Sequence, residues 1–189
     1  MSQVEIRMAM RCDIPALRDL QERSLRVLGH RHYTASQIEA FIARIGTMDD
    51  YLVDDRTYLV AQVGGEMLGC GGWTRRLPGY ASHAQGDVHA LDPSRATVRS
   101  VFVEPLAAGQ GIGRRIMSGV ESFMHMDGVR IAELGSTGNG VAFYNNLGYR
   151  ELNAFHVDIG DGNSMRLIRM SKPLASANVD EPGLASMTA

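Results

Sequence analysis

The sequence of 189 residues has little cysteine, no large excess of either charge and no long apolar run. Its two cysteines, Cys12 and Cys70, lie far apart and belong to no CxxC motif or Cys/His ligand spacing. That distribution argues against a disulfide framework and a zinc site, so both are interpreted as reduced, structural thiols. His30 and His32 have no third ligand nearby, and no metal is expected.

The charge is nearly balanced, with 19 Lys and Arg against 21 Asp and Glu. A dedicated nucleic-acid binder carries a strongly basic face, so small-molecule or peptide partners are favoured over nucleic acid. The N-terminal segment 1–11 is polar, and no apolar run reaches the length of a membrane span. We therefore expect a cytoplasmic protein without membrane contact.

The hydrophobic content of 44% is enough for one compact domain, which we expect over residues 1–174. The tail 175–189 is rich in Ala and Ser, and we expect it to be disordered. The polar segment 75–95 contains several Pro and Gly breakers. It is expected to be a long irregular loop and a candidate substrate lid.

The hydrophobic periodicity predicts an α/β fold with a central mixed β-sheet flanked by helices. Asp13 is expected to cap the first helix, and Ser36 with Glu39 has capping-box spacing for the second. A Gly64–Gly65 turn predicts an antiparallel hairpin. In chain order we expect a strand at 4–8, helices at 14–28 and 36–46, strands at 58–63, 67–73 and 97–103, a helix at 112–126, a strand at 129–134, a short helix at 141–147, and strands at 149–158 and 165–170.

The most informative stretch is the glycine-rich segment 109–114, which leaves a strand and opens a helix. Backbone amides and the helix dipole converge at such a point, and glycines let a pyrophosphate approach the amides. A Walker A loop is disfavoured, because it needs Lys and then Ser or Thr where this sequence has Arg114 and Arg115. A Rossmann turn is disfavoured too, because it needs its third glycine at position 114. A tight structural turn that binds no ligand is the remaining alternative.

This loop resembles the coenzyme A loop of the GNAT superfamily of N-acetyltransferases. The family pattern is Arg or Gln, two residues, Gly, one residue, Gly or Ala, and it aligns with residues 108–113, with Ala108 as the departure. The second family motif is an Asn, followed by Phe-Tyr, three residues and Gly-Phe. The residues of this sequence that resemble it are Asn139, Phe143, Tyr144, Gly148 and Tyr149. The resemblance spans roughly Val4 to Pro173 and implies the acyl-CoA N-acyltransferase fold.

The resemblance also implies an acyltransferase that moves acetyl from acetyl-CoA to a primary amine, by direct attack in a ternary complex. In the family the strand before the loop presents backbone groups to the acyl group and pantetheine arm, and the Asn hydrogen-bonds the pantetheine. The implied cofactor-binding residues are Val101, Phe102, Val103, Gly109, Gln110, Gly111, Ile112, Gly113, Arg114, Asn139 and Phe143.

Tyr144 is implied as the general acid. A phenol with a pKa of about 10 stays protonated at neutral pH and can protonate the departing thiolate. The alternative is a ring that only packs beside Phe143. The attacking amine must lose a proton, and Glu133 or Glu104 is a possible base, although either could be a solvated surface charge.

Residues in or beside the long loop, Trp73 and Tyr80 above all, could line the acceptor pocket. Scattered Arg and His residues on the same loop are more commonly solvated. The sequence does not identify the acceptor or the length of the acyl chain, and a hydroxyl acceptor is an alternative to an amine. A non-catalytic module that binds or senses acyl-CoA is the alternative function, and a homodimer is the oligomer that the resemblance suggests.

Overall fold

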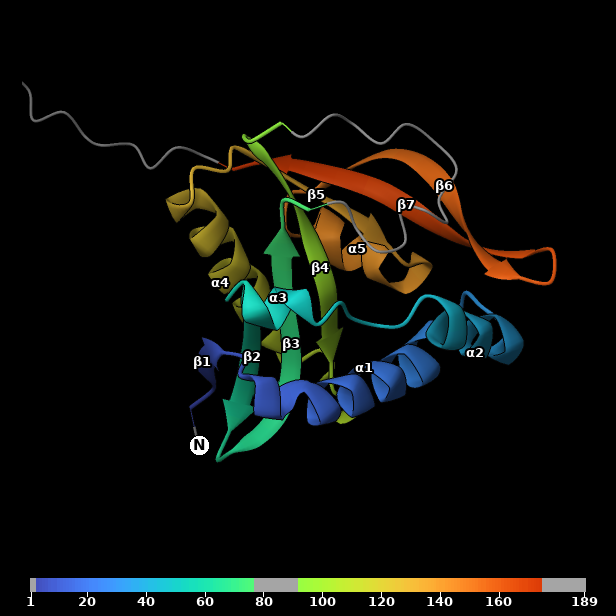
Figure 1. Ribbon diagram of the computed structural model, residues 1–189, viewed down its shortest axis with the longest axis horizontal. Helices are drawn as coiled ribbons and strands as arrows, with labels where there is room; N and C mark the ends of the chain where they lie inside the picture. Colours follow the sequence, from blue (N-terminus) through green and yellow to red (C-terminus); the bar gives the residue numbers. More distant parts are fainter. Residues whose placement is uncertain (1–2, 77–91, 175–189) are drawn as a thin grey trace, which may run out of the picture.

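A computed structural model describes residues 3–76 and 92–174, which form a seven-stranded mixed sheet with helices on both faces (Figure 1). The strand order is β1-β2-β3-β4-β5-β7-β6, and only β4 and β5 pair in parallel. The strands are β1 (Glu5–Met8), β2 (Tyr58–Val63), β3 (Glu66–Thr74), β4 (Arg95–Val103), β5 (Ile131–Ser136), β6 (Arg150–Gly160) and β7 (Asn163–Pro173). The helices are α1 (Ile14–Gly29), α2 (Ala35–Arg44), α3 (Tyr51–Asp54), α4 (Ile112–Met126) and α5 (Val141–Asn145), with 3₁₀ turns η1 (Arg11–Asp13), η3 (Pro105–Ala107) and η4 (Gly138–Gly140).

Helix α4 covers one face of the sheet with apolar side chains spaced four residues apart. Ile112, Ile116, Val120 and Met124 are all nearly or fully buried in the largest apolar cluster. Gly69 of β3 allows the close approach, because an added Cβ there would lie 2.8 Å from Ile116 Cδ1. The start of α4 is therefore fixed tightly against the strands.

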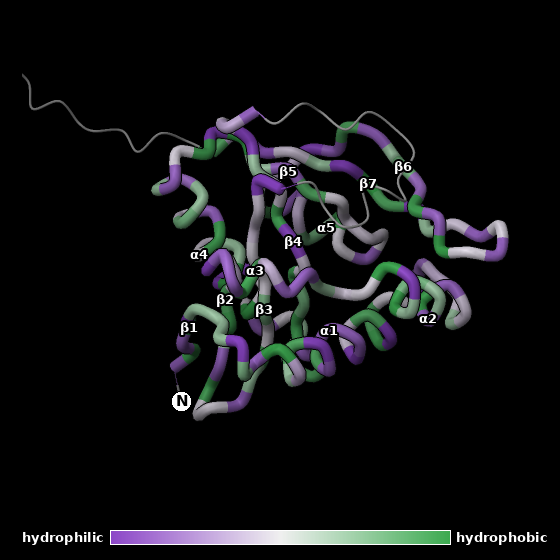
Figure 2. Tube along the Cα trace, viewed as in Figure 1, coloured by the Kyte–Doolittle hydropathy of each residue, from purple (hydrophilic) through white to green (hydrophobic). Residues whose placement is uncertain are grey.

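Helices α1 and α3 cover the opposite face. Along β2, Leu59 and Ala61 join the cluster under α4, whereas Tyr58 and Val60 join the cluster that contains Leu17 of α1. This is the alternation expected of a strand buried on both sides. Figure 2 shows hydrophobic and polar residues alternating along α1, as an amphipathic helix requires.

The expected order of strands and helices is confirmed, whereas the expected capping is confirmed only in part. Asp13 holds the N-cap position of α1, but its side chain makes no capping hydrogen bond to α1; its carboxylate accepts a hydrogen bond from the Met10 amide at 2.7 Å, at the start of η1. The capping box of α2 is formed by Thr34 and Gln37, because α2 begins at Ala35. Ser36 therefore lies inside the first turn, and α3, a single turn, was too short for its periodicity to be read.

Some expectations fall outside the described residues. Most of the loop at 75–95 is among them, including Tyr80, and so is the tail 175–189. Within residues 3–76 and 92–174, no helix is long and apolar enough to cross a membrane.

Candidate active site

A cavity of about 550 Å³ opens where β4 and β5 separate. The two strands pair only where Arg95–Thr97 of β4 lie beside Ile131–Glu133 of β5. Beyond these residues the strands line the cavity from two sides. A bulge in β4 accompanies the separation: Ser100 has a left-handed φ of 50°, opposite a register shift in β3. Bulges bend a strand and increase its twist, so the backbone edge of β4 is left open to the cavity.

The N-terminus of α4 forms one end of this cavity. Gly109 and Gly111 have φ values of 80° and 83°, and no atom lies within 4 Å of a Cβ added at either position. The first α4 amide that bonds back into the helix is that of Arg115, to Gly111 O at 3.1 Å. The amides of Ile112, Gly113 and Arg114 precede it, have no acceptor within an α-helix and belong to residues that line the cavity, so this donor set at the positive end of the helix dipole fits a pyrophosphate.

Gly113 has a different role from the two loop glycines. An added Cβ would lie 3.1 Å from the Phe143 ring, so the glycine lets α4 approach α5. The two family motifs therefore meet at this contact.

All the cofactor-binding residues expected from the sequence line the cavity except Gln110. The Gln110 side chain donates to Leu106 O at 3.0 Å, and its amide donates to Ala107 O at 3.3 Å. Its donors therefore stabilise the turn. Ala108, where the family pattern has Arg or Gln, does line the cavity.

Tyr144 also lines the cavity, from α5. Its ring contacts Phe143 and Tyr149 edge-on, with centroid distances of 5.0 and 5.7 Å. Among the described residues, none hydrogen-bonds to the Tyr144 hydroxyl, and burial raises its pKa above the usual value near 10. The side chain is thus both a packed ring and a phenol that stays protonated at neutral pH.

The carboxylates expected as bases lie outside the cavity lining. Glu133 points away from the face that carries Leu134 and pairs with Arg95 Nη1 at 2.6 Å. Glu104 pairs with Arg23 Nη2 at 2.9 Å. Each therefore pairs with an arginine, and neither lines the cavity in which the reaction is expected.

Trp73 lies outside this cavity too. It is 7% exposed within the cluster under α4, and the Arg75 guanidinium lies 5.4 Å from its ring centroid. The expectation that it lines the acceptor pocket is wrong for this cavity, because alternation along β3 directs the side chain into the core.

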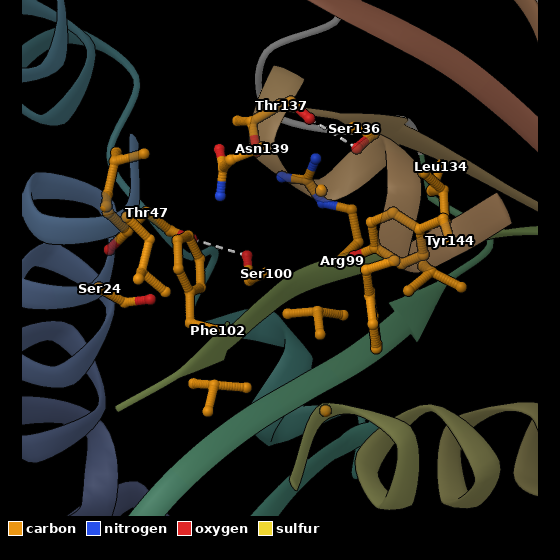
Figure 3. Close-up of a pocket in the computed structure, with 18 of the residues that line it drawn as sticks. Ser24, Thr47, Arg99, Ser100, Phe102, Leu134, Ser136, Thr137, Asn139 and Tyr144 are labelled. Carbon is orange, nitrogen blue, oxygen red and sulfur yellow. Dashed lines mark hydrogen bonds between the residues drawn. The ribbon is translucent and has the colours of Figure 1, made fainter. Parts of the chain in front are cut away.

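The other half of the cavity was missed by sequence reasoning. Its wall comes from α1, α2, the loop after α2 and the bulged part of β4 (Figure 3). No motif or spacing marks these residues, because they are distant in the chain. They include Ser24, Leu25, Leu28, Phe41, Ile45, Thr47, Met48, Asp49, Arg99, Ser100 and Leu167.

A closed ring of four hydrogen bonds holds this wall in place. Thr47 Oγ1 donates to Gln21 Oε1 at 2.7 Å, and Gln21 Nε2 donates to Tyr58 OH at 2.8 Å. Tyr58 OH donates to Ser100 O at 2.6 Å, and Ser100 Oγ donates to Thr47 O at 2.7 Å, the bond drawn in Figure 3. Gln21 is fully buried, so the ring ties the loop and the bulge to the core.

Comparisons with known proteins agree with this geometry. Residues 54–151 match the family model described as an acetyltransferase (GNAT) domain, which is more than half of the chain. The chain therefore belongs to the GNAT family, and it is an acyltransferase. No curated protein sequence matches it.

Solved structures share the fold at low sequence identity. A GCN5-related N-acetyltransferase from Rhodopseudomonas palustris has a TM-score of 0.70 at 19% identity, covering 92% of this chain and 98% of its own. The PaiA N-acetyltransferase from Thermoplasma acidophilum, in complex with coenzyme A, has a TM-score of 0.64 at 16% identity, covering 90% and 99%. The ribosomal-protein-S18-alanine N-acetyltransferase from Escherichia coli has a TM-score of 0.59 at 16% identity, covering 95% and 99%.

Proposed function

We propose that the protein transfers acetyl from acetyl-CoA to a primary amine by direct attack in a ternary complex, with Tyr144 as the general acid. The observation that carries the proposal is that three features meet in one cavity: the open start of α4, the unpaired edge of β4 and the Tyr144 side chain. The proposal assigns each of them to one part of the reaction.

Acetyl-CoA binding rests on the first two features. The pyrophosphate would lie on the amides at the start of α4, and the pantetheine would lie along Val101–Val103 with Asn139 beside it. The complex of the Thermoplasma neighbour with coenzyme A supports this choice of cofactor. The thioester would then lie within the part of the cavity that Tyr144 lines.

The chemistry needs one bond made and one broken. The amine nitrogen attacks the thioester carbonyl carbon, a C–N bond forms and the C–S bond breaks. Tyr144 donates its proton to the leaving sulfur, and the proton lost by the amine returns to the phenolate through solvent. A backbone amide of the bulged β4 would stabilise the oxyanion, because a fixed donor interacts more strongly as charge develops on the oxygen.

The test begins with calorimetric titration of the protein with acetyl-CoA, NAD and ATP. Binding of acetyl-CoA alone supports the cofactor assignment, and its absence overturns the proposal. The next step is a screen of primary amines with detection of the released thiol.

Tyr144→Phe is then expected to lower kcat about 100-fold with little change in acetyl-CoA affinity, the typical loss for a general acid. Tyr149→Phe is the matched control, since Tyr149 is the neighbouring tyrosine and does not line the cavity. Unchanged turnover in Tyr144→Phe would remove its catalytic role. Acetyl-CoA binding without transfer to any amine would favour a sensing module.

A further inference from the structure

An apolar wall lines the half of the cavity that the proposed cofactor site leaves over. Leu25, Phe41 and Ile45 pack in one apolar cluster together with Phe102, and Leu167 packs against Phe41 and Ile45 in the next cluster. Leu28 follows Leu25 by one helical turn and lines the cavity as well. The apolar wall therefore combines α1, the region of α2 and β7 in one surface, made of Leu25, Leu28, Phe41, Ile45 and Leu167.

The apolar wall begins beside the proposed reaction centre. Phe102 belongs to the β4 segment along which we propose that the pantetheine lies, and it packs in the same cluster as Leu25 of the wall. In Figure 3, Ser24 of α1 and Tyr144 lie on opposite sides of the cavity. An amine that attacks a thioester beside Tyr144 can therefore keep its other end on the apolar wall.

The charges of this half of the cavity neutralise each other. Within the described part of the chain, the charged side chains that line the cavity are those of Asp49, Arg99 and Arg114. Arg114 lies at the start of α4, whereas Asp49 Oδ2 and Arg99 Nη2 form an ion pair at 2.6 Å. A further charge buried beside this pair has no partner of its own, which is costly. The end of the acceptor that enters here is therefore expected to be uncharged.

Most polar side chains of this half are also bonded to one another. Thr47 Oγ1 donates to Gln21 Oε1, and Ser100 Oγ donates to Thr47 O, so both hydroxyls are used within the hydrogen-bond ring. Ser24, which is 3% exposed, adds a neutral hydroxyl. The apolar wall is thus the larger part of the surface that is left for a ligand.

We infer that the acceptor is a primary amine whose other end is an uncharged alkyl or aryl group, packed against the apolar wall. The inference rests on the proposed function, because it names the class of amine that acetyl-CoA meets. A diamine would place an ammonium group on the apolar wall, and an amino acid with its carboxylate at the far end would place an anion there. Neither charge gains a partner that offsets its loss of hydration, so both kinds of amine are expected to be poor acceptors.

The test compares three amines of one chain length that differ only at the far end. Pentylamine ends in a methyl group, 1,4-diaminobutane in an ammonium group and 5-aminopentanoate in a carboxylate. With saturating acetyl-CoA, kcat/KM for pentylamine is expected to exceed that for the other two at least about tenfold, since an unpaired charge is costly to bury. Equal or better turnover of the diamine or the amino acid would overturn the inference.

A longer acyl chain is the other ligand that suits an apolar wall, so the length of each substrate is varied in turn. Ethylamine leaves the wall empty, and its kcat/KM with acetyl-CoA is expected to be about 10- to 100-fold below that of pentylamine. Hexanoyl-CoA is then compared with acetyl-CoA. Turnover that rises with hexanoyl-CoA and does not distinguish pentylamine from ethylamine would assign the wall to the acyl chain and overturn the inference.

Leu28 allows the preference to be shifted by one substitution. It is half-buried and belongs to none of the apolar clusters of residues 3–76 and 92–174, so replacing it spares the core. Leu28→Glu puts a carboxylate on the apolar wall. The ratio of kcat/KM for pentylamine to that for 1,4-diaminobutane should fall about tenfold or more, because the far ammonium gains a charged partner. Val27→Glu is the matched control, since Val27 is 50% exposed and does not line the cavity, and it should keep the wild-type ratio.

The ratio is measured within one preparation of each protein, so it does not depend on the fraction that is folded. Acetyl-CoA affinity is measured for every variant by the same calorimetric titration. A wild-type protein that does not bind acetyl-CoA overturns the proposed function and the acceptor inference with it. A protein that binds acetyl-CoA but shows no preference for pentylamine overturns the acceptor inference alone. A Leu28→Glu variant that binds acetyl-CoA and keeps the wild-type ratio would also overturn it.

Discussion

Two glycines with the same φ allow the proposed anion site to be tested separately from stability. Gly111 precedes α4 and Gly128 follows it, both have a φ of 83°, and an added Cβ would meet nothing within 4 Å at either. Only Gly111 lines the cavity. Alanine at each position should therefore impose a similar strain from the left-handed φ, but only Gly111 lies at the proposed cofactor site.

The expected cost in stability follows from the left-handed conformation. A residue with a Cβ is less stable there by roughly 1–2 kcal/mol, so both Gly111→Ala and Gly128→Ala should lose about that much unfolding free energy. For a chain of this size the melting temperature should fall by about 2–8 °C. Urea denaturation and thermal melts of both variants measure the change.

The effect on the cofactor should separate the two variants. In Gly111→Ala a methyl group is added to a residue that lines the cavity directly before α4, where the proposed pyrophosphate site lies. Hydrogen bonds to a charged group are worth about 1.5–3 kcal/mol. The Kd for acetyl-CoA should rise roughly 10- to 100-fold, while Gly128→Ala should keep the wild-type Kd. Equal affinities in the two variants would refute the anion site at the start of α4.

Two further predictions concern the buried tyrosine Tyr58. Tyr58→Phe removes the donor to Ser100 O and the acceptor for Gln21 Nε2, and it should lower the unfolding free energy by about 1–3 kcal/mol in urea at pH 7; a loss well under 1 kcal/mol would contradict the ring's role. Burial also raises the pKa of Tyr58 well above 10, so above pH 10 the unfolded chain loses this proton and the folded chain keeps it. Stability should therefore fall as pH rises beyond 10, by up to about 1.4 kcal/mol per pH unit from this residue, and denaturation at pH 9, 10 and 11 should show a shallower decline in Tyr58→Phe. Identical slopes in the two proteins would contradict the assignment.

The part of the cavity at the start of α4, where we propose that the cofactor binds, was predictable because its signals are local in the chain. A glycine loop at a strand-to-helix junction turns amides and a helix dipole towards one point whatever surrounds it. The order of strands and helices was predictable from local periodicity, and the position of Tyr144 beside the loop was predictable from its motif. Gln110 was expected to bind the cofactor but does not line the cavity. Sequence spacing does not show that its donors are used within the turn.

The other half of the cavity, where we propose that the acceptor binds, was decided by tertiary structure alone. Gln21, Thr47, Tyr58 and Ser100 come from separate elements, and no spacing shows that their hydrogen bonds close into a ring. The same applies to the Asp49–Arg99 pair, whose members lie 50 positions apart. Glu133 looked as suitable as any carboxylate until strand pairing directed it to Arg95. Short motifs thus predict the backbone groups at the start of α4. The opposite wall of the cavity depends on which distant side chains the packing of the sheet brings together, and the sequence alone does not show this.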